Sequence, residues 1–347
     1  MEQTKKRISR VWKALIIVAV SLLALIGLLL LGVRMYFRLP LSSYYKASEK
    51  VFVIPDPDGD FVAQGLEYDA ANGLYLVTGY KKGGGASPVY CVGADGKLQK
   101  SVLLAKTDGT PCDCHAGGLA LAGDFLYLAG GVDGCLYVYR YADLMNASDG
   151  ASISAVGTLS TAVSEEDHLG PACVHAFDGH LLVGEFYRET VYPTPENHHL
   201  TTTAGETHKA LALTYPLDST SPIGVLETPD KAYSLPDQVQ GMYVSDGKIY
   251  LSTSWGLSKS VMYCYDLGRA TREPDLTVLG VTLPCFALDA TSLVSEVSFP
   301  PMAEEILVLN GKLYTMTESA SSKYIFGKFT GGKWCYATDL SYFDEQK

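Results

Sequence analysis

The chain has 347 residues, of which 47% are hydrophobic, and a formal net charge of −11 at pH 7. Its length is sufficient for one large folded core. The excess of acidic residues excludes nucleic acid as an expected partner, because binding to phosphates requires a basic surface.

The N-terminal region is a separate apolar segment. Residues 14–33 contain no charged residue, and residues 1–13 contain five Lys or Arg. A helix of about 20 residues crosses the hydrocarbon core of a bilayer, and basic residues before it favour a cytoplasmic N-terminus. We therefore expect a basic cytoplasmic segment at 1–13, a transmembrane anchor at 14–33, a tether at 34–48 and an exported domain at 49–345.

A cleaved signal peptide is the alternative interpretation of the same segment. Its apolar part would be shorter, and a site of small residues would follow it. Residues 33–38 read Val-Arg-Met-Tyr-Phe-Arg instead. The sequence thus favours a single-pass protein of the cell membrane with its main domain outside the cytoplasm. After residue 38 the chain has 20 basic and 37 acidic residues.

A short motif, Asn or Asp followed by Gly and then by Leu or Ile and Tyr, returns along the exported part. It stands at 72–76, 246–251 and 310–314, with looser copies at 123–128 and 178–183. Successive copies are 51, 55, 68 and 64 residues apart. Asn-Gly and Asp-Gly adopt the positive φ angles of tight hairpins, and hairpins repeated at this spacing are typical of a β-propeller.

Each copy belongs to one predicted blade of antiparallel strands. The first blade has strands near 64–68, 74–77, 89–92 and 98–104. The next three blades begin near His115, Ala172 and Gln240. The last has strands near 303–307, 313–316, 324–329 and 334–340, and the strand at 51–54 is expected to close the ring.

The predicted fold class is therefore all-β, a five-bladed β-propeller preceded by a single N-terminal transmembrane helix. A six-bladed propeller stays open, because the long stretches before the third, fourth and fifth blades could hold part of another blade. A β-sandwich explains the hairpins but not five similar units. An α/β fold requires helices between the strands, and no amphipathic helix is evident outside the anchor.

Eight cysteines leave the redox state open. An exported domain permits disulfides, but several of these cysteines lie inside apolar strands, where Cys acts as a small buried hydrophobe. Cys112 and Cys114 are too close in sequence for a usual zinc pair. We expect one or two disulfides at most.

Segments of the fourth and fifth blades resemble known proteins. Gln240–Met242, Ser252–Gly256, Pro300–Ile306 and Glu318–Tyr324 are similar to segments of poorly characterised bacterial secreted or membrane-anchored propeller proteins. The Gln-Gly and His-x-Gly-Gly openings of the blades resemble, more distantly, the strictosidine synthase, gluconolactonase and paraoxonase superfamily. The resemblance covers about residues 60–335, and its motifs are specific for the architecture.

The superfamily resemblance implies a calcium ion in the central channel, held by Glu, Asn and Asp from the innermost strands. The matching positions here are Gln64, Gly117, Ala172, Gln240 and Glu304. Only Glu304 is a carboxylate among them. From its own residues, the sequence therefore predicts no cofactor and no metal site.

Side chains at the start of the innermost strands converge on the channel of a propeller. Gln64, Glu67, Gln240 and Glu304 are the candidate ligand-binding residues, because amides and carboxylates exchange hydrogen bonds with polar ligands. Glu304 with His115 or His175 forms the candidate acid/base pair of a catalytic site. In the alternative interpretation, these groups bond to each other, to the backbone or to trapped water.

Adjacent residues of a strand point to opposite faces, so Glu304 and Glu305 must differ in role. By register Glu304 matches Gln64 and faces the channel. Glu305 occupies a position held by Gly in other blades, and we expect a structural role for it with a cation such as Lys323 or Arg188 as its partner.

The insertion at residues 192–209 carries His198, His199 and His208. Its Thr-rich composition favours a polar surface loop over a metal site.

The leading functional hypothesis is an extracytoplasmic binding or interaction module, for a small polar ligand or for another envelope or surface protein. A hydrolase or lactonase that acts on a small ester at the central channel is the alternative, and a ligand-free scaffold is the third. The sequence leaves open whether the protein is an enzyme.

Overall fold

The computed structural model describes residues 2–344, and it describes side chains from Arg10 to Phe343. Met1, residues 345–347 and the side chains of residues 2–9 in the predicted cytoplasmic segment lie outside the described part. The chain divides into two units, Met1–Ser43 and Tyr44–Lys347.

The first unit is helical. Helix α1 (Glu2–Arg38) contains the whole predicted anchor, and its apolar side chains from Val11 to Leu31 are largely exposed. It is long and apolar enough to cross a membrane, and a signal sequence has the same properties. The predicted tether contains the end of α1, then η1 (Leu39–Leu41) and α2 (Ser42–Ala47).

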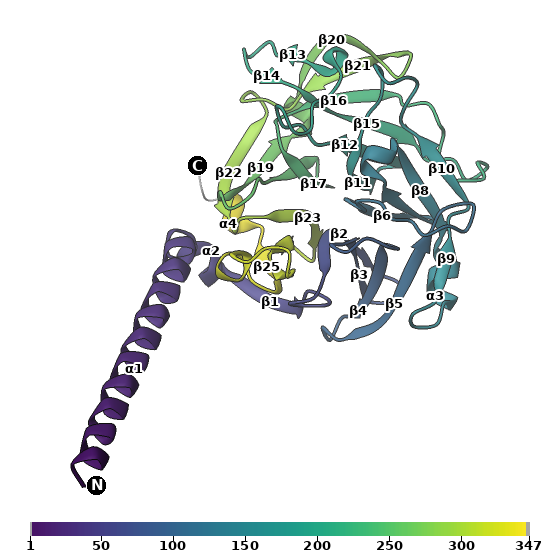
Figure 1. Ribbon diagram of the computed structural model, residues 1–347. Coiled ribbons are helices and arrows are strands. Elements are labelled where there is room, and N and C mark those ends of the chain that lie inside the picture. Colours follow the sequence, from purple (N-terminus) through teal and green to yellow (C-terminus); the bar gives the residue numbers. More distant parts are fainter. Residues whose placement is uncertain (1, 345–347) are drawn as a thin grey trace. The chain divides into compact units, whose positions relative to one another are not determined.

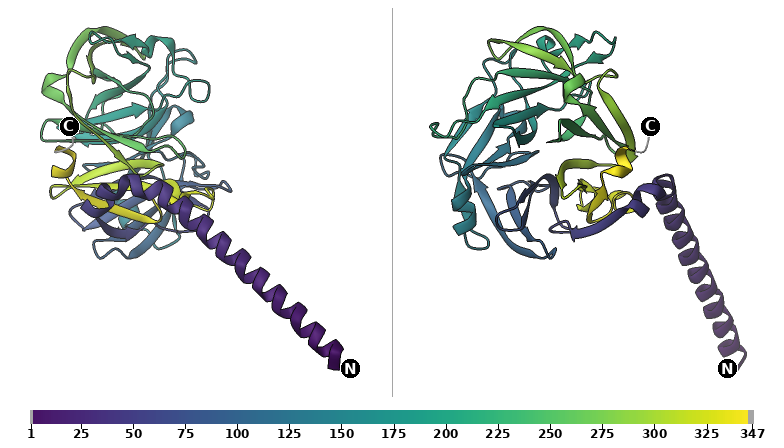
Figure 2. Two further views of the ribbon diagram at one scale, coloured as in Figure 1. Left: turned by 90° about the vertical axis from the view of Figure 1, so that its left-hand side faces the viewer. Right: turned by 180° about the vertical axis from the view of Figure 1, so that it is seen from behind.

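The second unit is a five-bladed β-propeller (Figures 1 and 2). Its five innermost strands contact one another in a closed ring around the central axis. They are β2 (Phe61–Asp69), β6 (Leu119–Ala122), β11 (Pro171–Phe177), β17 (Val239–Ser245) and β23 (Ala303–Leu309).

Outward from these strands, each blade continues as an antiparallel sheet. The first two blades add β3 (Leu74–Lys81), β4 (Pro88–Gly93) and β5 (Leu98–Ala105), then β7 (Phe125–Ala129), β8 (Cys135–Arg140) and β10 (Gly157–Ser160). The third and fourth add β12 (His180–Glu185), β15 (Ala210–Pro216) and β16 (Lys231–Leu235), then β18 (Lys248–Thr253), β19 (Ser260–Asp266) and β22 (Leu293–Phe299). The fifth adds β24 (Lys312–Thr317), β25 (Trp334–Asp339) and β1 (Ser48–Val53).

Short elements connect or extend the blades. Several lie in the loops: η2 (Gly131–Asp133), α3 (Tyr141–Asn146), η3 (Glu196–His198), β13 (Leu200–Thr201), β14 (Thr207–His208), η4 (Leu267–Arg269), η5 (Glu318–Ala320), η6 (Gly327–Phe329) and α4 (Ser341–Asp344). Others add parallel strands at blade edges: β9 (Ser152–Ser154) pairs with β5, and the hairpin β20 (Thr271–Val278)–β21 (Val281–Ala287) pairs with β16.

These additions account for the stretches that left a sixth blade open. The segment before β22 supplies the hairpin β20–β21, which widens the third blade to six strands instead of starting a new one. The prediction of five blades is confirmed.

The ring closes where the two ends of the propeller unit meet. Strand β1 pairs antiparallel with β25, from Ser48 opposite Thr338 to Val53 opposite Trp334, as the sequence predicted for this segment. The strand expected at 324–329 was wrong: these residues form a loop that ends in η6. This loop is free of strand pairing and supplies side chains to the site described below.

Hydrophobic contacts join the blades. Five clusters of buried apolar residues each combine side chains of two neighbouring blades. Cysteines contribute to these clusters, and among residues 2–344 all eight are free thiols rather than disulfides. The packing between blades therefore provides the core that disulfides were expected to reinforce.

The repeated motif forms tight turns as predicted. Asp178-Gly179, Asp246-Gly247 and Asn310-Gly311 each place two consecutive residues at positive φ, for example 52° at Asp246 and 74° at Gly247. This is the geometry of a type I′ hairpin turn, and it sets the register of the first two strands of each of these blades.

We predict that Gly247→Val destabilises the propeller by about 1–2 kcal/mol, because a β-branched side chain disfavours the left-handed backbone. The space around Gly247 is open, so steric crowding contributes nothing to the loss. Gly170→Val is the control, since a Cβ on Gly170 would meet only Gly131 O, at an ordinary contact distance of 3.9 Å, and Gly170 has no positive φ. Equal midpoints for the two variants in urea unfolding would contradict this reading of the turn.

Candidate functional site

The five innermost strands all begin at one end of the channel, which we name the mouth face. Four of these strands contain a bulge near their start, at Gln64, at Ala172, at Gln240 and at Glu304 with Glu305. A bulge redirects a side chain relative to the sheet. Gln64, Gln240 and Glu304, which the sequence predicted to be equivalent, therefore each lie in a bulge at the same level of the channel.

Glu305 fills the centre of the propeller below this level. Its Oε1 accepts a hydrogen bond from Met242 N at 3.1 Å. A Cβ on Gly118 would lie 2.8 Å from Glu305 Oε2, and one on Gly241 would lie 2.6 Å from Glu305 Cα. Glycine is therefore required at these two positions, which belong to the second and fourth blades.

The cation expected beside Glu305 was a wrong prediction. Arg188 stacks on Trp255 and Lys323 lies over Tyr80, so both are engaged elsewhere. Burial raises the pKa of Glu305 well above its ordinary value. Burial favours the neutral form of this carboxyl group, although the hydrogen bonds from backbone N–H donors act in the opposite direction.

Glu304 lies at the mouth face and is 1% exposed. Its Oε1 is buried without a hydrogen-bond partner among the described residues. Burial is the main cause that raises its pKa, and the charges of Glu318 and Glu305 add to the effect. Glu304 and Glu318 thus form a pair of interacting carboxyl groups that are unfavourable to ionise together.

Glu318 comes from the loop that follows β24. Its Oε2 accepts hydrogen bonds from Tyr324 Oη at 2.7 Å and from Gln64 Nε2 at 3.4 Å. Gln64 Nε2 also donates to Ala63 O at 3.0 Å. Burial raises the pKa of Glu318 to about 7, although these two hydrogen bonds and Lys323 act in the opposite direction.

Aromatic rings and one cation form the rim beside this pair. Lys323 Nζ lies 4.8 Å from the ring centroid of Tyr80 and 5.0 Å from that of Tyr324, and it donates to Tyr80 Oη. The imidazole of His115 stacks on Tyr80 with centroids 4.7 Å apart. Desolvation by the groups around it lowers the pKa of His115, and the charge of Lys323 lowers it further. The neutral ring is therefore favoured.

Two predicted residues lie at the other end of the channel. Glu67 pairs with Leu76 near the hairpin end of β2, and its carboxylate accepts hydrogen bonds from Tyr68 N at 2.8 Å and Leu121 N at 3.1 Å. His175 lies near the corresponding end of β11, with its ring 4.2 Å from that of Tyr243. The structure therefore groups Gln64, Glu304 and His115 at the mouth face, with Gln240 at the same level, and separates Glu67 and His175 from them.

The calcium ion that the superfamily resemblance implies does not fit this channel. Of the five matching positions, only Glu304 offers a carboxylate, and the amide nitrogen of Gln64 is directed at Glu318. Among residues 10–343, no group of three or more His, Cys, Asp or Glu side chains is arranged to hold a metal ion.

The histidines of the insertion are structural and not exposed as the composition suggested. His198 is fully buried, and its Nδ1 lies 2.7 Å from Glu185 Oε1. His208 is buried with Nδ1 2.8 Å from Ser234 Oγ. These bonds fix the insertion against the second and fourth strands of the third blade.

Sequence reasoning missed Glu318, Tyr324, Tyr80 and Lys323 as members of the site. A usable signal was present: in an antiparallel blade, the second strand ends at the level where the first begins. Lys81 pairs with Phe61 and Thr317 with Ala303, so the residues beside these strand ends must lie at the mouth face.

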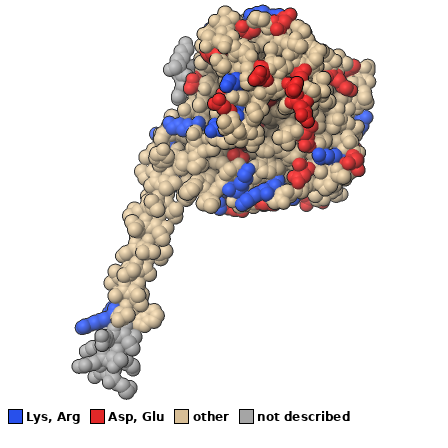
Figure 3. All heavy atoms as spheres, turned by 45° about the horizontal axis from the view of Figure 1, so that its top comes forward, with Lys and Arg blue, Asp and Glu red and all other residues tan. Residues whose placement is uncertain are grey.

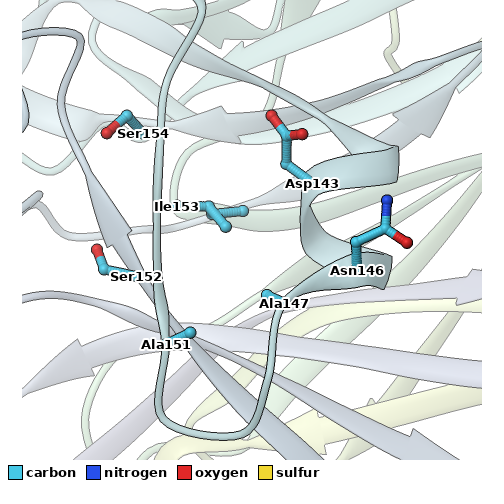
Figure 4. A pocket seen from close by; sticks show the side chains of 7 residues that line it. All are labelled: Asp143, Asn146, Ala147, Ala151, Ser152, Ile153 and Ser154. Carbon is cyan, nitrogen blue, oxygen red and sulfur yellow. The ribbon is translucent and has the colours of Figure 1, made fainter.

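The surface outside the channel is mixed in charge, and a pocket opens on it beside α3. Acidic and basic side chains both occur on the face shown in Figure 3. The pocket, of about 370 Å³, lies between α3 and residues 151–154 (Figure 4). It adjoins the outer strand β9, and none of the predicted site residues lines it.

Comparisons with known proteins give structural neighbours but no sequence relative. No protein-family model and no curated protein matches the sequence. The crystal structure of Myxococcus xanthus glutaminyl cyclase is similar at 12% identity over 84% of this chain and 94% of that chain, with a TM-score of 0.43. The PQQ-bound aldose sugar dehydrogenase of Streptomyces coelicolor is similar at 12% identity over 84% and 96%, with a TM-score of 0.45.

We predict that Glu318→Gln gains thermal stability relative to the wild type as the pH rises from 5 to 8. A carboxyl group whose pKa is raised to about 7 contributes stability that is fully present below its ordinary value of 4.5 and is lost as the pH rises through 7. Gln remains neutral throughout, so the difference in Tm should shift in favour of the variant.

The control is Asp95→Asn. The hydrogen bond from Lys97 lowers the pKa of Asp95, so Asp95 is ionised at pH 5 and at pH 8, and the difference in Tm should stay constant. A constant difference for Glu318→Gln as well would contradict the raised pKa.

Proposed function

We propose that the propeller is an extracytoplasmic module, anchored by residues 14–33, that binds a small polar ligand at the mouth face through Glu304, Glu318, Gln64 and Gln240. The ligand offers an O–H or N–H donor to the carboxyl pair. Its remaining surface packs against Tyr80 and Tyr324.

The observation that carries this proposal is the unpartnered Oε1 of Glu304. Burying an acceptor without a hydrogen bond costs about 1–3 kcal/mol of folding free energy. Such atoms are rare in native proteins, and a bound ligand or water is a common explanation for them. Because the neighbouring Glu318 lies in the loop after β24 and is partly exposed, a small donor group has a short path to the pair.

The rim supports the same proposal. Tyr80, Tyr324 and His115 present flat surfaces beside the carboxyl pair, and Lys323 is already stacked on two of these rings. Rings next to hydrogen-bonding groups are typical of small-molecule sites, where the apolar surface gives affinity and a few polar atoms fix the orientation.

Acid/base catalysis on a small ester is the second candidate function. One observation favours it: burial raises the pKa values of both Glu304 and Glu318, and the charge of Glu318 raises that of Glu304 further. At neutral pH such a pair retains a proton on one carboxyl group while the other accepts one, as general acid/base chemistry requires. Glu318 takes the role that the sequence assigned to His115 or His175.

The test is Glu304→Gln in the full chain, with binding screened by thermal shift against polyols, monosaccharides, primary amines and lactones. For the compound that binds best, Glu304→Gln and Gln240→Ala should each weaken affinity by about 1–3 kcal/mol. If that compound is a lactone that the protein hydrolyses, Glu304→Gln should also lower the rate by about 100-fold or more.

Glu67→Gln is the matched control, because it changes the same residue type at the opposite end of the same channel. Its affinity and rate should equal those of the wild type. Unchanged affinity for Glu304→Gln, or an equal loss for Glu67→Gln, would remove the mouth face as the binding site.

The membrane anchor has its own test. A reporter fused after Lys347 should be active only outside the cytoplasm, and the protein should stay in the membrane fraction after carbonate extraction, because the uninterrupted apolar run of α1 is long enough to remain inserted. A mature protein that begins near residue 35 would show a cleaved signal peptide and would contradict anchoring.

A further inference from the structure

A second polar and aromatic cluster lies on the mouth face, between the third and fourth blades. The guanidinium carbon of Arg188 lies 4.0 Å from the ring centroid of Trp255. Phe186 and Tyr192 complete the cluster, with ring centroids 6.2 Å and 6.3 Å from that of Trp255. Tyr192 is 44% exposed, so the cluster is open to solvent at one side.

The backbone holds the two parts of this cluster together. Gln238 N donates to Tyr187 O at 3.2 Å, and Ser254 N donates to Gln238 O at 3.1 Å. These bonds link the segment before Arg188 to the segment before Trp255. The turn that carries Arg188 closes through bonds with Tyr192, and it holds Thr190 at a φ of 69°, a strained value for a β-branched residue.

Arg188 has no carboxylate partner among the side chains from residue 10 to 343. The nearby carboxylates Glu189 and Asp237 interact with Lys209 instead: after its hydrogen bond to Tyr187, their charges raise the pKa of Lys209. After residue 38 the chain has 37 acidic residues and 20 basic ones, so an arginine without an acidic partner stands out. Stacking occupies the flat face of the guanidinium. It leaves the N–H groups at the edge available to donate hydrogen bonds to an anion.

We propose that Arg188, Trp255, Phe186 and Tyr192 form a second site, which binds an oxyanion carried on a flat apolar group, such as an aromatic carboxylate. The guanidinium edge holds the two oxygens of the anion in parallel hydrogen bonds. The neighbouring rings pack against the apolar group. This site does not depend on Glu304 or Glu318, so it stands or fails separately from the function proposed above.

The chain provides a matched control for Arg188. The guanidinium carbon of Arg140 lies 5.2 Å from the ring centroid of Phe125. Arg140 ends β8, at the opposite end of the propeller from the mouth face, and its side chain is exposed. It offers a stacked guanidinium without the surrounding rings of Phe186 and Tyr192.

Trp255 itself supplies the readout. The chain has three tryptophans, Trp12, Trp255 and Trp334, so Trp12→Phe/Trp334→Phe in the full chain leaves Trp255 as the only indole. The fluorescence of this variant is titrated in detergent with phenylacetate, phenylacetamide and phenyl phosphate. The amide has nearly the same shape as phenylacetate but lacks the charge, and phenyl phosphate separates a phosphate ester from a carboxylate as the source of the oxyanion.

Phenylacetate should bind about tenfold more tightly than phenylacetamide, as expected for one charge-assisted pair of hydrogen bonds. Arg188→Gln should abolish this preference, while Arg140→Gln should retain it. Tighter binding of phenyl phosphate would support the site and identify a phosphate ester as its preferred oxyanion. Equal binding of phenylacetate and phenylacetamide, or a preference that survives in a folded Arg188→Gln protein, would overturn the proposal.

Discussion

The close approach of five innermost strands around one axis is the constraint on which this propeller depends. At Gly118 and Gly241 the neighbouring backbone and Glu305 lie so near that any side chain would collide with them, and at Gly65 a Cβ would lie 2.6 Å from Thr78 Cγ2. Glu305 occupies the space beside Gly118 and Gly241. Because Met242 N of the fourth blade donates to Glu305 Oε1, this carboxyl group links two blades at the centre of the ring.

The polar residues of the mouth face lie at the bulges and loops next to these crowded strands. Bulges interrupt the innermost strands at Gln64, at Gln240 and at Glu304, at one level of the channel. Loops after the second strands, which escape strand pairing, then add Glu318, Lys323 and Arg188. The result is a set of buried carboxyl groups at the centre and stacked cations at the edge.

The elements that repeat in the sequence, the hairpin turns and the blade openings, could be predicted. The Asp-Gly and Asn-Gly turns gave the blades, and the shared openings of the blades gave the level of Gln64, Gln240 and Glu304. Sequence reasoning failed where tertiary contacts decide: the 324–329 segment has the composition of a strand but forms a loop, and Glu305 is stabilised by the backbone of another blade instead of a cation. Glu318 and the pairing of Arg188 with Trp255 arise from loops without a repeat, so no periodic pattern pointed to them.

The proposed site requires Glu304 and Glu318 to be an interacting pair of carboxyl groups that the ligand contacts directly. Carboxyl ¹³C NMR of the Glu-labelled protein, with the two signals assigned from Glu304→Gln and Glu318→Gln, measures this most directly. We expect both signals to titrate far above the ordinary value for Glu. Loss of either residue should change the titration of the other, and the best-binding compound should shift both signals. Independent titration of both groups near pH 4.5 without a response to that compound would contradict the proposed site.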